Sequence, residues 1–177
     1  MEEEELGAEG RRIKRKSTAR SSLENVMTLL SGMGYHTRDY DLHINFPGGT
    51  PVDGPSAGVA MAVVAASALT GRPVDGHVAV TGEVSVRGLV KPVGGVPGKV
   101  EAAERAGLST VLIPQDNRME RFEHTTIEVC PIATLEEALT RMLLPASAQA
   151  PAGSAATPSQ APVPVLAAEE QTAAGNG

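Results

Sequence analysis

The feature that most restricts the folds open to this chain is an apolar run, SAGVAMAVVAASALTG, at residues 56–71. The run is rich in alanine and valine and is apolar on every side. Because it contains good helix formers and leaves no polar face, it predicts a helix that is buried all round. Gly71 is the expected end of that helix, and Ser56 lies in its first turn. The chain must therefore enclose a helix in its core.

Segments with helical or strand periodicity lie on both sides of this run. Aromatic residues make up only 2% of the chain, so valine, alanine, isoleucine and leucine must build the core, which suits a sheet covered by small-residue helices. The alternation of strands and helices predicts an α/β or α+β domain. The other predicted helices cover residues 21–34, 97–107 and 134–144, and the predicted strands cover 40–46, short pieces of 77–96, 109–114 and 125–132.

Two capping boxes mark expected helix starts. Ser21 and Glu24 form one of them, and Thr134 and Glu137 form the other. In each box the hydroxyl side chain accepts a hydrogen bond from the amide three residues later, and the glutamate reaches back towards the start of the helix. These pairs predict helices that begin at Ser21 and at Thr134.

The two ends of the chain differ in composition from its middle. Residues 1–17 have no hydrophobic periodicity and change in charge from EEEE to RRIKRK, which predicts a charged, flexible arm. Residues 145–177 are rich in alanine and proline and hold too little apolar surface to offset the entropy lost on ordering. They are predicted to be a disordered tail. Residues 18–144 remain as one folded domain.

Charge and cysteine content restrict the possible functions. The net charge of −6 argues against a nucleic-acid or anionic-membrane surface. A single cysteine, Cys130, cannot form an internal disulfide, and no Cys or His pair has the spacing of zinc ligands. The acidic N-terminus lacks the apolar core of a signal peptide, and no apolar run is long enough to span a membrane. We therefore expect a cytoplasmic protein without a metal.

The first of three interpretations of Ser56 is a nucleophile elbow. GPSAG matches the pattern G-x-S-x-G of α/β-hydrolases, in which a strand runs directly into the serine and a histidine serves as its base. Here GGTPVDGP precedes the serine, and no later Asp and His present themselves as a pair. The histidines that would test this interpretation are His77 and His124.

A second motif, VGGVPGKV, is similar to a phosphate-binding loop that ends at Gly98 and Lys99. Such a loop needs a glycine five positions before Gly98 and a serine or threonine directly after the lysine. The chain has Val93 and Val100 at those two positions. Nucleotide binding at this loop is therefore not expected.

The third interpretation pairs Ser56 with Lys99. A serine hydroxyl attacks well only when a base removes its proton, and a lysine can do so once burial lowers its pKa towards neutrality. Lys99 lies among valines near the start of a predicted helix, and both features disfavour its charged form. Ser56 lies at a helix start, where backbone amides can receive an oxyanion. The residues alone leave open that Ser56 is a helix N-cap and Lys99 a solvated surface lysine.

Three longer stretches resemble one known family. HINFPGGTPVDGPSAGVAMA, VAVTGEVSVRGLVKPVGGVPGKVEAAERAG and STVLIPQDN together resemble the proteolytic domain of Lon proteases, especially the B-type Lon of spore-forming bacteria, over roughly residues 18–144. The resemblance implies the Lon protease α/β fold, a mixed sheet with packed helices. It also implies a serine endopeptidase that cleaves unfolded or damaged proteins through an acyl-enzyme.

The resemblance also assigns roles to individual residues. In this family the serine of DGPSAG is the nucleophile and the lysine after GG is its general base, which gives these roles to Ser56 and Lys99. Thr81 of the TGE motif and Asp53 are implied as supporting residues, with a turn residue and a helix cap as equally open interpretations. For His43, on the strand that borders the site in this family, a structural role is favoured over a catalytic one.

Partners and cofactors follow from the same resemblance. Lon proteases carry an ATPase module, but the chain has no Walker motif, so ATP is implied only through a separate module in cis or in trans. The family further implies a hexamer that acts on unfolded proteins or peptides, without nucleic acid or membrane. The family's first protease strands are not recognisable in MEEEELGAEGRRIKRK. The alternative is therefore an inactive, truncated protease-like subunit with an assembly or regulatory role.

Overall fold

The protein is organised around a three-stranded parallel sheet. The computed structural model describes residues 3–6, 12–15, 18–45, 54–119, 122 and 125–146. The strand order is β3-β6-β7, with β6 in the middle and parallel to both neighbours. The strands are β3 (Val78–Val80), β6 (Thr110–Pro114) and β7 (Glu128–Ile132).

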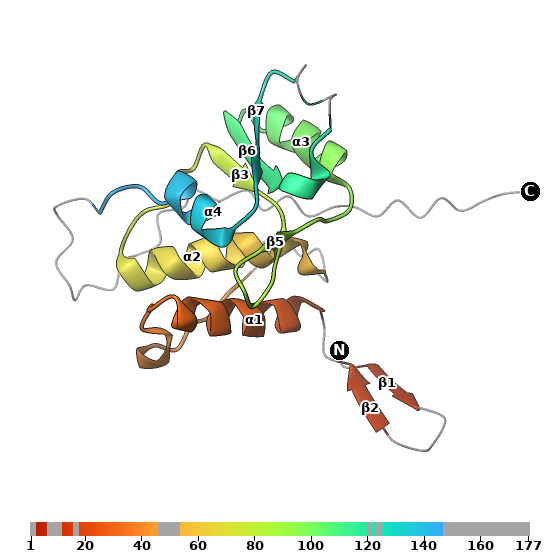
Figure 1. Ribbon diagram of the computed structural model, residues 1–177, viewed down its shortest axis with the longest axis vertical. Helices are drawn as coiled ribbons and strands as arrows, with labels where there is room; N and C mark the ends of the chain where they lie inside the picture. Colours follow the sequence, from red (N-terminus) through yellow and green to blue (C-terminus); the bar gives the residue numbers. More distant parts are fainter. Residues whose placement is uncertain are drawn as a thin grey trace, which may run out of the picture.

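Helices cover both faces of this sheet (Figure 1). α2 and α4 pack on one face, α1 lies along α2 on the side away from the sheet, and α3 packs on the opposite face. This arrangement confirms the predicted α/β class. The helices are α1 (Thr18–Gly32), α2 (Gly58–Thr70), α3 (Val96–Arg105) and α4 (Leu135–Met142).

The central strand β6 separates two hydrophobic clusters. Leu112 belongs to the cluster that includes α1, α2 and α4, whereas Val111 and Ile113 belong to the cluster that includes α3. Successive side chains of a strand point to opposite faces, which explains this division. All three side chains are fully buried, so the uninterrupted apolar sequence of β6 reflects a strand covered on both faces.

The apolar run at residues 56–71 forms a helix, as its composition predicts. Most of α2 is buried, and Gly71 follows it in the left-handed region with a φ of +67°. A short 3-10 turn, Pro55–Ala57, leads into the helix and holds Ser56. Val64, Ala68 and Thr70 are exposed, so the helix is not buried all round, and the serine precedes its buried residues 58–63.

Two antiparallel strand pairs accompany the main sheet. β4 (Glu83–Val84) pairs with β5 (Val90–Lys91), within the stretch where short glycine-separated strands are predicted. β1 (Glu3–Leu6) pairs with β2 (Arg12–Arg15), although no strand is predicted in residues 1–17. The backbone register of this hairpin pairs Glu3 with Arg15 and Leu6 with Arg12.

The predicted strand at residues 40–46 is wrong for its described part. Residues 41–45 form no helix or strand, and Phe46 lies outside the described residues. The alternation behind the prediction is real, because Leu42 and Ile44 pack against the core while His43 is exposed. A strand also needs a hydrogen-bonded neighbour, and no strand pairs with 41–45 within the described ranges.

The two capping boxes have different outcomes. α1 begins at Thr18, so Ser21 lies inside the helix and the predicted start is one turn too late. Thr134 does precede α4, and its hydroxyl accepts a hydrogen bond from the amide of Glu137 at 3.3 Å. The Glu137 carboxylate accepts from the amide of Ala133 at 2.9 Å, one residue before the position that a capping box predicts.

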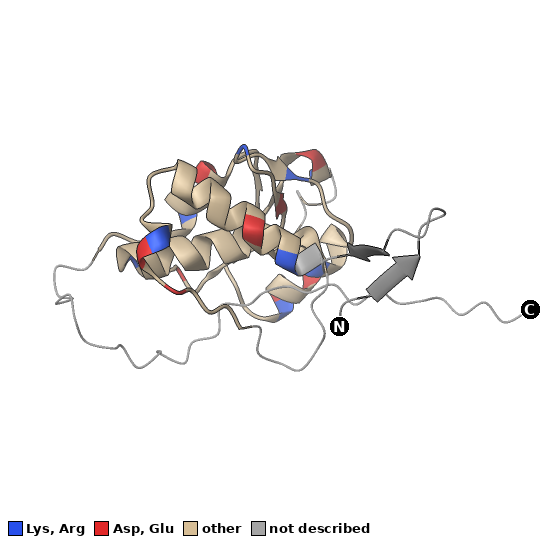
Figure 2. Cartoon of the chain, turned by 90° about the horizontal axis from the view of Figure 1, so that it is seen from below, with Lys and Arg blue, Asp and Glu red and all other residues tan. Residues whose placement is uncertain are grey.

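The surface carries charges of both signs. Figure 2 shows basic and acidic positions interspersed over the elements on the face that it presents. No helix in the described ranges is both long enough and apolar enough to cross a membrane. The tail predicted at 145–177 lies outside the described residues from position 147 onward, so its disorder stays a prediction.

Gly58 allows α2 and β4 to approach each other closely. A Cβ atom at this position would lie 2.9 Å from the backbone nitrogen of Val84. The amide of the next residue, Val59, donates to the carbonyl of Gly82 at 3.1 Å. The start of α2 is therefore packed directly against the backbone of residues 82–84, with no space for a side chain between them.

We expect Gly58→Ala to lower the free energy of unfolding. Overpacking costs about 1–3 kcal/mol, which exceeds the gain of up to about 1 kcal/mol from replacing a helical glycine by alanine. Gly54→Ala is the matched control, because a Cβ there meets nothing within 4 Å and the backbone φ of 164° is extended. Urea unfolding of both variants measures the difference. A Gly58→Ala variant as stable as wild type would contradict the close approach.

Candidate active site

Ser56 lies in the 3-10 turn Pro55–Ala57 that leads into α2, two residues before the helix begins, and not in the first turn of the helix as the apolar run predicts. Its side chain is half-buried, and no hydrogen bond to another described residue engages its hydroxyl. The N-cap of the turn is Gly54 and that of α2 is Ala57, and neither N-cap residue forms a side-chain capping hydrogen bond. The interpretation of Ser56 as a helix N-cap is therefore wrong, and its hydroxyl has no structural hydrogen bond in the described part of the chain.

Lys99 is a buried residue of α3. Only 2% of it is exposed, and its Nζ donates a hydrogen bond to Thr81 Oγ1 at 3.1 Å. Burial lowers the pKa of Lys99 below its usual value, because desolvation disfavours the ammonium form. No carboxylate of the described residues forms an ion pair with Lys99 that would oppose this effect. The interpretation of Lys99 as a solvated surface lysine is wrong.

Thr81 connects Lys99 to the Ser56 turn. It follows β3 directly, is 1% exposed, and its amide donates to the carbonyl of Leu112 in β6 at 3.1 Å. Its hydroxyl donates to the carbonyl oxygen of Ser56 at 3.4 Å while accepting from Lys99 Nζ. Because the hydroxyl proton is directed to Ser56, the oxygen of Thr81 can accept from Lys99 in either protonation state of the amine.

Gly82 holds the turn from the other side, a role that the sequence patterns do not show. Its amide donates to the carbonyl of Ser56 at 2.9 Å, and its own carbonyl accepts from the amide of Val59. A Cβ atom on Gly82 would lie 2.8 Å from Cγ1 of Val90, and its φ of +154° favours glycine. The one sequence signal for this role is that Gly82 is the glycine of the TGE motif, since a glycine within strand pieces often marks a close approach of two backbones.

The remaining predicted residues make no hydrogen bond to Ser56, Thr81 or Lys99 in the part of the chain that the structure describes. Asp53 is outside the described residues, so its supporting role stays a prediction. His43 is exposed on the irregular segment 41–45. His77 is exposed and precedes β3, at the opposite end of that strand from Thr81, and His124 is outside the described residues. No histidine among the described residues forms a hydrogen bond with Ser56, as the nucleophile elbow would need.

The glycine-rich loop before α3 does not have the arrangement of a phosphate loop. A phosphate-binding lysine must extend its amine towards the ligand. Lys99 instead points its amine into the protein, onto Thr81. The absence of nucleotide binding at this loop stays a prediction.

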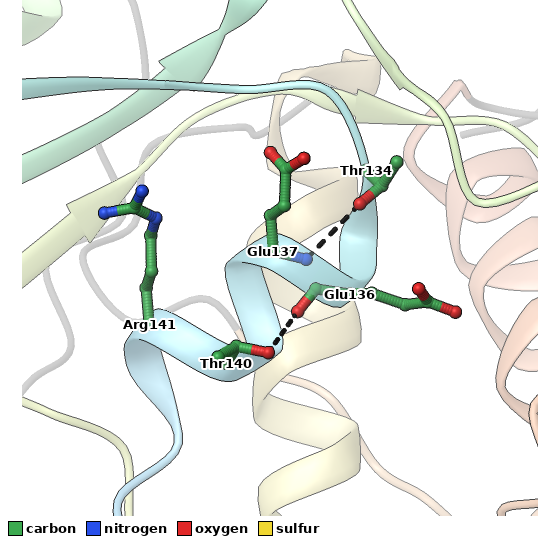
Figure 3. A pocket seen from close by; sticks show the side chains of 5 residues that line it. All are labelled: Thr134, Glu136, Glu137, Thr140 and Arg141. Carbon is green, nitrogen blue, oxygen red and sulfur yellow. Dashed lines mark hydrogen bonds between the residues drawn. The ribbon is translucent and has the colours of Figure 1, made fainter.

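A surface depression lies elsewhere, on α4 (Figure 3). It has a volume of about 580 Å³ and is lined by Thr134, Glu136, Glu137, Thr140 and Arg141. The hydroxyls of Thr134 and Thr140 are engaged in hydrogen bonds with the backbone of this helix, as the dashed lines in Figure 3 show. Ser56, Thr81 and Lys99 do not line it, so this depression is distinct from the candidate active site.

Comparison with known proteins identifies related sequences. The family described as the Lon protease (S16) C-terminal proteolytic domain matches residues 13–144. Lon protease 2 of Bacillus subtilis is 48% identical over 144 residues, which cover 81% of this chain and 26% of that protein. Lon protease of Halothermothrix orenii is 44% identical over 64% of this chain and 15% of its own length. Lon protease of Escherichia coli is 45% identical over 58% of this chain and 14% of its own length. The aligned region thus spans about a quarter or less of each relative.

Proposed function

This chain belongs to the family of Lon protease C-terminal proteolytic domains, and from this membership we propose that it is a serine endopeptidase with Ser56 as nucleophile and Lys99 as general base. One observation carries the proposal. The buried amine of Lys99 contacts Thr81, whose hydroxyl is held on the backbone carbonyl of Ser56. Among the described residues, no hydrogen bond engages the hydroxyl of Ser56 and no carboxylate pairs with Lys99, which supports the proposed roles of both side chains.

The proposed reaction is acyl transfer to Ser56. Neutral Lys99 takes the hydroxyl proton as Ser56 Oγ bonds to the carbonyl carbon of a peptide. The resulting ammonium then returns the proton to the leaving amine as the peptide C–N bond breaks. Water then attacks the acyl carbon and loses a proton to Lys99, and Lys99 passes that proton to Ser56 Oγ as the ester C–O bond breaks and the carboxylic acid product leaves. Burial assists the reaction because the lowered pKa of Lys99 makes its neutral form available closer to neutral pH.

The oxyanion of the intermediate needs donors near Ser56. The amides of Gly58 and Val59 already donate to the carbonyls of Pro55 and Gly82. We therefore assign the amide of Ser56 itself as a donor, as the nucleophile's own amide serves in other serine proteases. The sequence predicts only that backbone amides at the helix start receive the oxyanion, and this assignment names one of them, the amide of Ser56.

Substrates, assembly and energy supply are proposed from the family alone. Unfolded proteins or peptides are the proposed substrates, and a hexamer is the proposed assembly. The glycine-rich segment before α3 does not suit ATP, since its lysine is buried on Thr81. ATP is therefore assigned to a separate ATPase module in cis or in trans, and no step of the reaction proceeds through it. Thr81 and Asp53 are proposed as supporting residues.

A serine-reactive peptidyl phosphonate tests this function directly. Attack by the serine oxygen displaces a phenolate from phosphorus, and we expect mass spectrometry to locate the adduct on Ser56. Lys99→Ala should lower the labelling rate by about 100-fold or more, because the serine loses its base. Lys91→Ala is the matched control, since Lys91 is exposed on β5. Absence of the adduct from the wild-type chain would support the alternative of an inactive assembly subunit.

A further inference from the structure

We propose that Asn117 is a positioning residue that sets Lys99 against Thr81 by holding the main chain of Val93. The inference rests on the proposed function, because it concerns the base of that reaction. Asn117 ends the 3-10 turn Gln115–Asn117, directly after β6. Its Oδ1 accepts from the amide of Val93 at 2.8 Å, and its Nδ2 donates to the carbonyl of Val93 at 3.1 Å. We call this pair of hydrogen bonds the Asn117–Val93 clasp.

The clasp requires a carboxamide. One donor and one acceptor on a short side chain match the amide and carbonyl of a single residue, so the two bonds fix both the position and the orientation of that backbone. An aspartate offers only acceptors, and its charge would face the carbonyl of Val93. Both Asn117 and Val93 are half-buried, so the clasp lies partly out of the solvent that competes for such bonds.

The clasped residue leads directly into the helix that carries Lys99. Gly95 precedes α3 in the left-handed region with a φ of +66° and leaves no side-chain cap at this helix start. The amide of Lys99 donates to the carbonyl of Gly95 at 3.2 Å. Only Gly94 separates the clasp at Val93 from Gly95, which accepts this first bond of α3. The clasp therefore determines where the helix turn that holds Lys99 begins.

Hydrogen bonds attach both partners of the Lys99–Thr81 contact to the same strand, β6. Thr81 is bound to β6 through the carbonyl of Leu112, and the start of α3 is bound to the end of β6 through Asn117. Two attachments to the same strand therefore set the distance of 3.1 Å between Lys99 Nζ and Thr81 Oγ1. Val96 and Val100 bury α3 against the sheet, but apolar packing is non-directional and tolerates small shifts along the helix axis. The clasp supplies the directional constraint.

Titration of Lys99 tests the clasp without reference to catalysis. The full chain is labelled with ¹³Cε-lysine, and the Lys99 signal is assigned by its loss in Lys99→Arg. In Asn117→Ala we expect a looser site that admits water, so the neutral fraction of Lys99 at a given pH should fall by about threefold to tenfold. Gln115→Ala, an exposed position in the same turn, should titrate as wild type. Thermal unfolding confirms that each variant is folded at the temperature used.

Peptide hydrolysis provides the second measurement. Asn117→Ala should lower kcat by about 10- to 100-fold and leave KM nearly unchanged, because a small displacement of a base affects the chemical step. Asn117→Asp keeps the shape of the side chain but not its donor, so it should be impaired as well. A role in filling space alone would be preserved by the aspartate. Gln115→Ala should retain the wild-type kcat.

The two measurements separate this inference from the proposed function. If wild type hydrolyses peptides through Ser56 but Asn117→Ala and Asn117→Asp keep its kcat and its Lys99 titration, the clasp does not position Lys99. If wild type hydrolyses nothing and Ser56 takes no label, the proposed function fails. The Lys99 titration then still decides the clasp, because an unchanged titration in Asn117→Ala overturns it and an altered one supports it.

Discussion

Ser56→Ala and Lys99→Ala are each expected to reduce cleavage of a fluorescently labelled unstructured protein by about 1,000-fold or more, while the fold is retained. The first variant removes the atom that forms the acyl-enzyme, and the second removes the base that activates it. Because the two groups act as a unit, the double variant should be little worse than either single one. Undiminished turnover in either variant would rule out the proposed pair.

Lys99→Arg distinguishes proton transfer from simple positive charge. A guanidinium stays protonated in proteins, so arginine cannot accept the proton of Ser56 and this variant should also be inactive. Lys91→Arg, at an exposed position, is the matched control and should keep full activity. Circular dichroism and thermal unfolding establish that each variant is folded. Near-normal activity of Lys99→Arg would show that another group is the base.

Lys99→Met is expected to abolish activity and to raise the free energy of unfolding at neutral pH by on the order of 1 kcal/mol. Methionine has a similar length and no charge to desolvate, and the lysine is 2% exposed with no carboxylate partner among the described residues. Thr81 keeps its hydrogen bond to the carbonyl of Ser56 when the amine is removed. The variant would thus lose activity and gain stability, because a buried active-site charge that is needed for catalysis lowers the stability of the fold.

The dependence on pH tests the cause of this stabilisation. The unfolded lysine has its ordinary pKa of 10.5, and burial lowers the pKa in the folded state. Between these two values the unfolded state binds more protons, so the free energy of unfolding of wild type rises with pH across that window. Below the lowered pKa the cost of burying the ammonium is complete, and above 10.5 it is absent. The free energy of unfolding of Lys99→Met should therefore exceed that of wild type by most at low pH, and the difference should shrink as pH rises.

Urea unfolding of wild type and Lys99→Met across this pH range measures the expected convergence. Lys91→Met, at an exposed site, is the control and should differ from wild type by a similar small amount throughout. A difference between wild type and Lys99→Met that does not change with pH would exclude desolvation of the lysine as its cause. A methionine variant that is less stable at neutral pH would show that the Lys99–Thr81 bond outweighs that desolvation.

The apolar face of helix α3 includes one lysine, and the sequence alone does not show whether the amine of that lysine is buried. Val96, Val100 and Ala103 recur at helical spacing and are buried. Lys99 falls on the same face, so it interrupts an apolar stripe. A lysine at such a position can extend its amine to solvent along the stripe or bury it. Only the presence of Thr81 opposite, supplied by another strand, shows that the amine is buried.

The segment 41–45 and helix α1 show where local patterns are insufficient. Leu42 and Ile44 alternate with polar residues as in a strand, but alternation reports one covered face and not a hydrogen-bonded neighbour. The start of α1 at Thr18 likewise overrides the capping box at Ser21, because a helix can continue through a potential cap when the preceding residues also favour it. In both cases the pattern was present and a different structural context decided the outcome.

Residue patterns were sufficient for the α/β class, for the largely buried helix α2 and for the position of Ser56 near its start, because helix formation and burial of an apolar run depend on neighbours a few positions apart. The contacts that join Lys99, Thr81 and Ser56 come from α3, the end of β3 and the turn before α2. Their meeting depends on the pairing of β3 with β6 and on the packing of α3 against that sheet. Such contacts join residues far apart in the sequence, whose local patterns carry no information about each other's position in space.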